Sequence, residues 1–146
     1  RDVFDCAYLY LVDRPYNRVS NVNRFHPDLC PENENMLALE ITCHYNDNTW
    51  NGSDEELFDL CIPYLEKDNF IIESEVKQYF SIRVKSAYPF YKLGYRKHLE
   101  KIREHFEKFP NLVIAGRTGA FKYMDIDQCM EDTAELANRL DKKGTL

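Results

Sequence analysis

Hydrophobic positions in the first third of the chain fall into short runs that predict β-strands. Residues 6–12 (CAYLYLV) form a continuous apolar and aromatic run, which indicates a buried strand. Residues 36–45 (MLALEITCHY) predict a second strong strand. Residues 18–26 predict a weaker one, joined to the first by a turn over residues 13–17. Residues 27–35 hold two prolines and three acidic residues, a composition typical of a loop.

The hydrophobic spacing changes to that of a helix after a turn over residues 46–52. Ser53 and Glu56 fit a capping box, in which each side chain accepts a hydrogen bond from the other residue's backbone amide. The apolar positions that follow at helical spacing are Leu57, Leu60, Cys61, Tyr64 and Leu65. Pro63 lies inside this pattern, so we expect a kink or an irregular last turn.

A partly alternating segment, residues 76–88, predicts a long strand that ends at Tyr88-Pro89. It places Phe80, Ile82 and Val84 on one face. A helix is then predicted from about residue 92 to residue 108. Its buried stripe consists of Leu93, Leu99, Ile102 and Phe106.

The C-terminal residues predict a strand, a glycine-containing connection and a helix. Residues 112–115 (LVIA) form a short buried strand, and the last helix begins near Asp125 or Asp127 and runs to about Lys142. Its inward residues are Met130, Ala134, Ala137 and Leu140. Lys142-Lys143-Gly144 is typical of a helix C-terminus. The predicted fold class is α+β, with a mixed β-sheet and about three helices.

Composition and charge exclude several classes of function. With 44% hydrophobic residues among 146, the chain can bury a core, and its net charge of −6 offers no basic footprint for nucleic acid. It holds no apolar run of about 18 residues, so we expect no membrane span and a cytoplasmic location. Arg1-Asp-Val-Phe-Asp5 matches neither a signal nor a transit peptide, and no methionine precedes it, so we expect a fragment of a longer chain.

Cysteine and histidine positions give no sign of a metal site. The five cysteines are widely and irregularly spaced without a CxxC pair, which favours reduced, buried thiols over a structural zinc site. The four histidines are isolated from one another. No Ser-His-Asp or Cys-His arrangement can be read from the spacing, so a nucleophilic hydrolase is not indicated.

Residues 111–127 (NLVIAGRTGAFKYMDID) carry the most informative pattern in the chain. A buried strand that stops at a glycine delivers the next residues to the rim of a sheet, where ligands commonly bind. Gly116 and Gly119 permit close approach of the backbone to a ligand. Arg117 offers a positive fork suited to phosphate, and Tyr123 a hydroxyl on a rigid ring. An ordinary strand-to-helix connection with an arginine salt bridge is the alternative.

This segment resembles the C-terminal flavin-binding segment of UDP-galactopyranose mutases, Gly-Arg-Leu-x-x-Tyr-x-Tyr-x-Asp-Met-Asp. It is equally similar to the segment Gly-Arg-Asn-Gly-x-Phe-x-Tyr-x-x-x-Asp of FAD-dependent proteins of bacterial polysaccharide gene clusters, which are amine-oxidase-like or protoporphyrinogen-oxidase-like. Upstream, Ala87-Tyr-Pro-Phe-Tyr91 resembles the Ala-Tyr-Pro-Val-Tyr block of these proteins. The resemblance is strong over residues 83–140 and looser over residues 6–82. Thr118 and Phe121 depart from the Leu and Tyr of the mutases.

The resemblance implies a division of the chain into two parts. Residues 1–90 would be a portion of a substrate domain. Residues 91–146 would supply the helix, strand and C-terminal helix that complete a Rossmann FAD domain. The chain contains no GxGxxG sequence, so the N-terminal Rossmann FAD domain would be a missing partner from the same polypeptide, and the isolated fragment would be catalytically inert.

The resemblance also implies roles for individual residues. Gly116, Arg117, Gly119 and Asp125 would bind FAD, while Arg117, Tyr123 and Tyr88 would bind substrate. No catalytic residue and no metal ligand are assigned. The function implied is that of the substrate-binding, FAD-completing part of a flavoprotein acting on a nucleotide sugar or polysaccharide precursor, with mutase and oxidase or desaturase chemistry both open. The alternative is a non-catalytic binding or interaction domain that keeps the fold without flavin.

Overall fold

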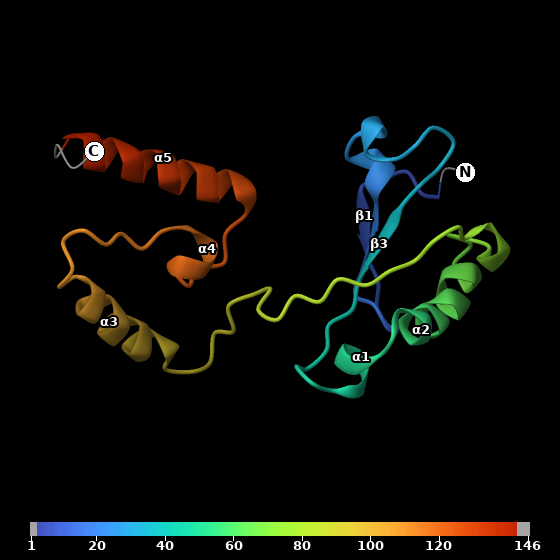
Figure 1. Cartoon of the computed structure of the whole chain (residues 1–146), viewed down its shortest axis with the longest axis horizontal. Helices are drawn as coiled ribbons and strands as arrows, with labels where there is room; N and C mark the ends of the chain where they lie inside the picture. Colours follow the sequence, from blue (N-terminus) through green and yellow to red (C-terminus); the bar gives the residue numbers. More distant parts are fainter. Residues whose placement is uncertain (1–2, 143–146) are drawn as a thin grey trace. The chain divides into compact units, whose positions relative to one another are not determined.

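The computed structural model describes residues 3–142, which form an α+β fold with one three-stranded antiparallel sheet and five α-helices (Figure 1). The chain divides into two compact units, residues 1–85 and 86–146. The sequence predicted a boundary between two parts of the chain after residue 90. In the structure the boundary follows residue 85, so Ala87–Tyr91 belongs to the second unit. Each unit is described by itself below.

The sheet of the first unit has the strand order β1-β2-β3, formed by Tyr8–Tyr10, Arg18–Asn21 and Leu37–Glu40. Both pairings are antiparallel, so the expectation of a mixed sheet is wrong for the described residues. The segment predicted as the weaker strand provides the central one. Leu9 opposes Val19, and Val19 opposes Leu39. A turn with left-handed Asp13 joins β1 to β2.

One face of this sheet forms the core of the unit. Val19 is completely buried and clusters with Tyr16 and with Cys61 and Leu65 of helix α2 (Asp54–Lys67). Tyr8 and Tyr10, on the other face, are exposed. Residues 6–12 are therefore not a buried strand as predicted, because among the described residues the core cluster lies on one face of the sheet only.

Helix α2 begins with the predicted capping box. The Ser53 hydroxyl accepts from the Glu56 amide at 3.1 Å, and the Glu56 carboxylate accepts from the Ser53 amide at 2.7 Å. The helix continues through Pro63 to Lys67. Leu60 and Tyr64 are exposed, contrary to expectation, because the helix packs on the sheet through Cys61 and Leu65. Ile62 is the third buried residue of the helix.

Short helical turns occupy the connections of the first unit. They are η1 (Val22–Arg24), η2 (Pro27–Leu29), α1 (Asn48–Asn51) and η3 (Glu73–Glu75). Asp47 caps α1, where its carboxylate accepts from the Trp50 amide at 2.7 Å.

The long strand predicted over residues 76–88 is absent from the described structure. Residues 76–84 have no ladder hydrogen bonds, and residues 85–86 form a turn. The alternating sequence favours extended backbone, but a strand also needs a neighbour with which to pair.

The second unit contains helices α3 (Tyr95–Phe106), α4 (Gly116–Gly119) and α5 (Ile126–Lys142), so both predicted long helices are confirmed. The buried strand predicted at residues 112–115 is wrong. That segment is irregular, and Leu112 and Val113 are exposed, because no described strand pairs with it.

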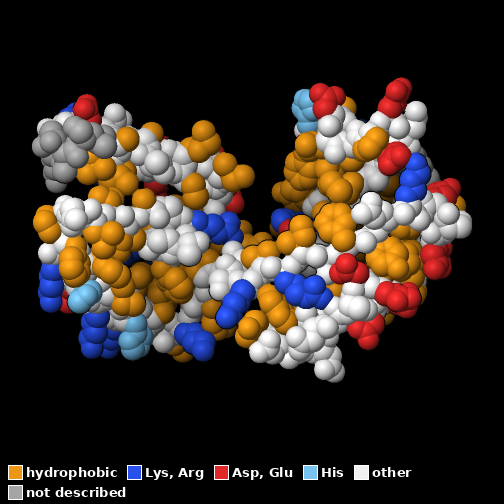
Figure 2. Space-filling view, in the orientation of Figure 1, with side chains coloured by type: hydrophobic (Ala, Val, Ile, Leu, Met, Phe, Trp, Pro, Cys, Tyr) orange, Lys and Arg blue, Asp and Glu red, His pale blue; other side chains and the backbone are white. Residues whose placement is uncertain are grey.

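Apolar residues of this unit remain largely at the surface (Figure 2). In α3, Leu99 is half-buried while Ile102 and Phe106 are exposed, and Leu93 precedes the helix and is exposed. The half-buried residues of α5 are Cys129, Leu136 and Leu140. Met130, Ala134 and Ala137 are exposed, contrary to prediction. The predicted glycine stop, Gly144, lies outside the described residues.

Candidate functional site

The Arg117 guanidinium and two tyrosine rings form the most distinctive cluster of the second unit. The central carbon of the guanidinium lies 4.8 Å from the ring centroid of Tyr88 and 4.6 Å from that of Tyr123. The two rings are stacked, with centroids 5.8 Å apart and planes 18° from parallel. Both rings are about half exposed, 54% for Tyr88 and 52% for Tyr123. The guanidinium is thus within cation–π distance of both rings, which lie too close together to be on opposite sides of it.

Backbone carbonyls fix the orientation of this guanidinium. Arg117 Nη1 donates to the Met124 carbonyl at 3.0 Å, and Nη2 donates to the Ala87 carbonyl at 3.4 Å. Met124 is itself buried. Among residues 3–142, no carboxylate forms an ion pair with Arg117, so the salt bridge that was the alternative interpretation is not seen. The positive charge is held in place with N–H donors left over for a ligand.

Tyr91 connects the Ala87–Tyr91 segment to the loop that carries Tyr123. Its hydroxyl accepts a hydrogen bond from the Tyr123 amide at 2.6 Å. The Tyr91 ring also packs against Tyr95 and Phe121, at centroid distances of 4.7 and 5.9 Å. The sequence assigned Tyr91 no role in the site and did not predict this bond. The one available signal was its place in the Ala87–Tyr91 block.

The two glycines of the motif differ in what the backbone requires of them. Gly116 has φ of +72°, a conformation that side chains disfavour, although a Cβ there would meet open space. A Cβ on Gly119 would lie 3.5 Å from the Ile114 side chain, an ordinary contact. Gly116 is therefore needed for the sharp entry into α4. Gly119 shows no comparable backbone requirement.

Asp125 lies just before α5 and is exposed. Its amide donates to Gln128 Oε1 at 3.0 Å, and its carbonyl accepts from the Cys129 amide at 3.0 Å. These bonds place it at the start of the last helix, as expected. Its carboxylate makes no recorded contact with Arg117, Tyr88 or Tyr123. The structure thus brings together Tyr88, Arg117 and Tyr123, three of the six predicted residues. The other three, Gly116, Gly119 and Asp125, lie close to Arg117 and Tyr123 in the sequence.

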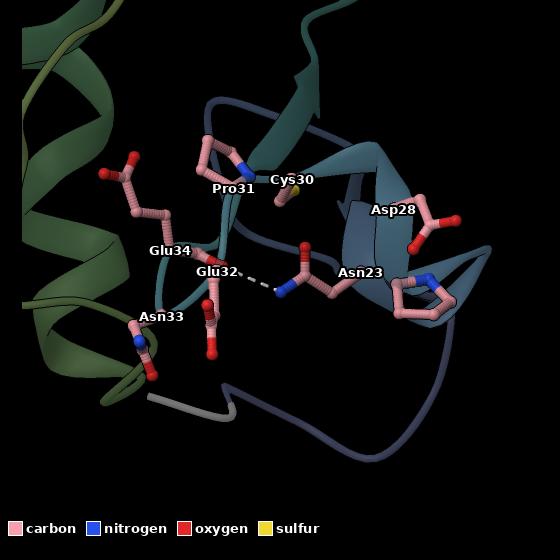
Figure 3. Close-up of a pocket in the computed structure, with 8 residues that line it drawn as sticks. Asn23, Asp28, Cys30, Pro31, Glu32, Asn33 and Glu34 are labelled. Atoms are coloured by element: carbon pink, nitrogen blue, oxygen red, sulfur yellow. Dashed lines mark hydrogen bonds between the residues drawn. The ribbon is translucent and has the colours of Figure 1, made fainter.

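Residues of this cluster line neither of two hollows in the surface. One, of about 450 Å³, lies between the end of α3 and residues 112–114. The other, of about 390 Å³, lies in the first unit along the predicted loop 27–35 (Figure 3). There the side-chain amide of Asn23 points toward the loop, and its Nδ2 donates to the Glu34 backbone carbonyl at 2.9 Å. Neither hollow contains a residue of the predicted site.

The described residues offer no group of three or more His, Cys, Asp or Glu side chains placed to hold a metal ion. Within residues 3–142, none of the helices combines the length and hydrophobicity that a bilayer span requires.

Comparisons of the chain with protein-family models, curated proteins and solved structures find no match in any of the three. The functional interpretation therefore depends on the motif residues and on the geometry of the Arg117 cluster.

Proposed function

We propose that this chain is the C-terminal, substrate-binding and FAD-completing part of a cytoplasmic flavoprotein that acts on a nucleotide sugar or a related polysaccharide precursor. The observation that carries the proposal is the Arg117 cluster. Tyr88 and Tyr123 are 35 residues apart in the sequence, yet both stack against one guanidinium that has no carboxylate partner among the described residues.

The chemistry of the cluster suits a diphosphate. A guanidinium donates two parallel hydrogen bonds to phosphate oxygens, and stacking on aromatic rings holds its plane in one orientation. The hydroxyls of Tyr88 and Tyr123 make no hydrogen bond within the described residues, so both remain available as donors to the same ligand. A binding site for a nucleotide sugar needs this combination of fixed charge and aromatic surface.

Flavin binding would require the Rossmann domain that the resemblance implies, with Gly116, Gly119 and Asp125 next to the cofactor. FAD would supply the covalent or hydride chemistry. Arg117 and the two tyrosines would hold the diphosphate of the substrate while the sugar reacts. Mutase chemistry and oxidase or desaturase chemistry make the same demand on these three residues.

A non-catalytic binding domain is the second candidate function. The irregular segment at residues 112–115 favours it, because the strand expected to return to a Rossmann sheet is not formed in the described chain. This candidate predicts that changes at Arg117 and Tyr123 leave the function of the full-length gene product intact.

Steady-state kinetics on the full-length gene product with nucleotide-sugar substrates separates the two. We expect Arg117→Ala to lower turnover by about 10²-fold, since it removes the group that stabilises the diphosphate charge. Arg96→Ala is the matched control, because Arg96 is an exposed arginine in the same unit outside the cluster. Equal activity of wild type and Arg117→Ala would contradict the proposal.

A further inference from the structure

Residues 76–84 form an extended segment whose backbone is almost unpaired. Beyond Val76, whose amide donates to the Glu73 carbonyl at 3.0 Å, the one backbone hydrogen bond recorded in this segment runs from the Ser81 amide to Asp54 at 3.1 Å. A strand with free N–H and C=O groups along its length is a template for pairing with another strand.

Alternate side chains attach the segment to its own unit. Tyr79 stacks on Phe58 of α2, with ring centroids 4.2 Å apart and planes 13° from parallel. The Ser81 hydroxyl bonds to Asp54, and Arg83 Nε donates to the Trp50 carbonyl at 2.6 Å. These odd-numbered residues fix which side of the segment faces the unit.

Three apolar even-numbered residues of the segment are exposed to solvent, while Val76 is half-buried. Phe80, Ile82 and Val84 are exposed by 62%, 78% and 61%. All three are aromatic or β-branched, the residue types that favour strands. The segment therefore presents an apolar row beside an unpaired backbone, a combination typical of an interaction surface.

Charges of opposite sign lie at the two ends of the segment. Glu73 and Glu75 precede it, and Arg83 and Lys85 lie at its end. None of the four side chains forms an ion pair in the part of the chain that the structure describes. Arg83 donates to carbonyls and to Ser81, and Lys85 lies over the Tyr45 ring at 4.4 Å. An antiparallel partner with the same sequence would bring Glu75 against Arg83 at both ends.

We propose that residues 76–82 pair with the same residues of a second copy of the chain as a two-fold symmetric antiparallel strand pair centred on Tyr79. In this register Val76 opposes Ile82, and Gln78 opposes Phe80. Glu75, the last residue of η3, then lies opposite Arg83. A symmetric contact of this kind is self-complementary, because each pair occurs twice. Parallel pairing in register would place like charges together.

Sedimentation velocity of the chain over a range of concentrations tests the pairing. We expect a monomer–dimer equilibrium whose dissociation constant rises by about tenfold or more in Ile82→Lys, since the change places a charge in the apolar row. Val12→Lys is the matched control, because Val12 is a β-branched residue of the same unit that is 84% exposed and lies outside the segment. It should dissociate like the wild type.

A charge reversal tests the register. Glu75→Lys should weaken the dimer several-fold, because it places a positive charge opposite Arg83 of the paired strand. A wild type that stays monomeric at every concentration would overturn the proposal and leave the segment to a strand of different sequence. Equal effects of Ile82→Lys and Val12→Lys, or a Glu75→Lys dimer as tight as that of the wild type, would overturn it as well.

Discussion

The Arg14–Asp68 pair links the stability of the first unit to pH at the scale of single residues. Arg14 Nε and Nη2 donate to the two carboxylate oxygens at 2.8 and 2.6 Å, and these hydrogen bonds hold the pKa of Asp68 below its ordinary value. A lowered carboxyl pKa contributes stability that is present above the ordinary pKa, about 3.9, and is lost as the pH falls through the lowered value.

We therefore expect Asp68→Asn to reduce the free energy of unfolding at pH 7 and to matter progressively less as the pH falls below about 4. Urea unfolding followed by the fluorescence of Trp50, the single tryptophan of the chain and a residue of the first unit, measures both differences. A difference between the two proteins that is the same at pH 7 and at low pH would contradict this assignment.

Cys61 differs from the other cysteines in burial. It is buried, while Cys6, Cys30, Cys43 and Cys129 are half-buried, so the expectation of buried thiols holds for Cys61 only. Burial raises the pKa of the Cys61 thiol to about 11. In native protein treated with iodoacetamide at pH 8, we expect mass spectrometry to find alkylation at the other four and none at Cys61 until urea is added. Native labelling of Cys61 as fast as of Cys30 would show that the core is open.

Tyr91 tests whether the loop bearing Tyr123 must be held in place. Tyr91→Phe keeps the ring contacts and removes the acceptor for the Tyr123 amide, a loss of about 1 kcal/mol. We expect substrate affinity of the full-length gene product to fall several-fold in a titration. The Tyr95 hydroxyl, in the same ring cluster, makes no hydrogen bond within the described residues, so Tyr95→Phe should bind like the wild type. Equal affinities of the two variants would leave Tyr91 with a packing role.

The sequence predicted part of this site because its signals are local. Arg117 and Tyr123 lie within one short motif, and the resemblance brought Tyr88 to the same place. The Tyr91–Tyr123 bond joins residues 32 apart and depends on how the segments pack. Such a contact leaves no spacing in the chain from which to infer it.

At the scale of elements, the capping box of α2 carries a direct prediction. Ser53→Ala removes the acceptor for the Glu56 amide and should lower the free energy of unfolding of the first unit by about 1 kcal/mol. Urea unfolding monitored by Trp50 fluorescence measures it, and Ser53→Asp, which keeps a capping oxygen, should unfold close to wild type. No loss of stability in Ser53→Ala would show that the cap contributes little.

Helices were predicted well, and strands only where a partner lies nearby in the chain. Helix α2 was located by its cap and its periodicity, both of which act within a few residues. Residues 76–88 and 112–115 have equally strong strand sequences, yet neither is paired in the described structure. Strand propensity is local, whereas pairing requires another segment, and this is why those two predictions failed.

At the scale of the whole molecule, the division into two units predicts where the chain is cut first. Lys85 is exposed in the turn between residues 1–85 and 86–146. In brief trypsin digestion we expect the earliest cleavage after Lys85, giving one fragment from each unit by mass spectrometry. First cuts inside α2 or α5, with the bond after Lys85 intact, would contradict this division.

The account as a whole depends on whether the motif around Arg117 serves a flavin. The most direct measurement is the visible absorbance spectrum of the purified full-length gene product, followed by identification of any flavin released on denaturation. The account predicts a yellow protein with about one FAD per chain. A colourless protein that neither contains flavin nor takes up added FAD would contradict it and favour the non-catalytic binding domain.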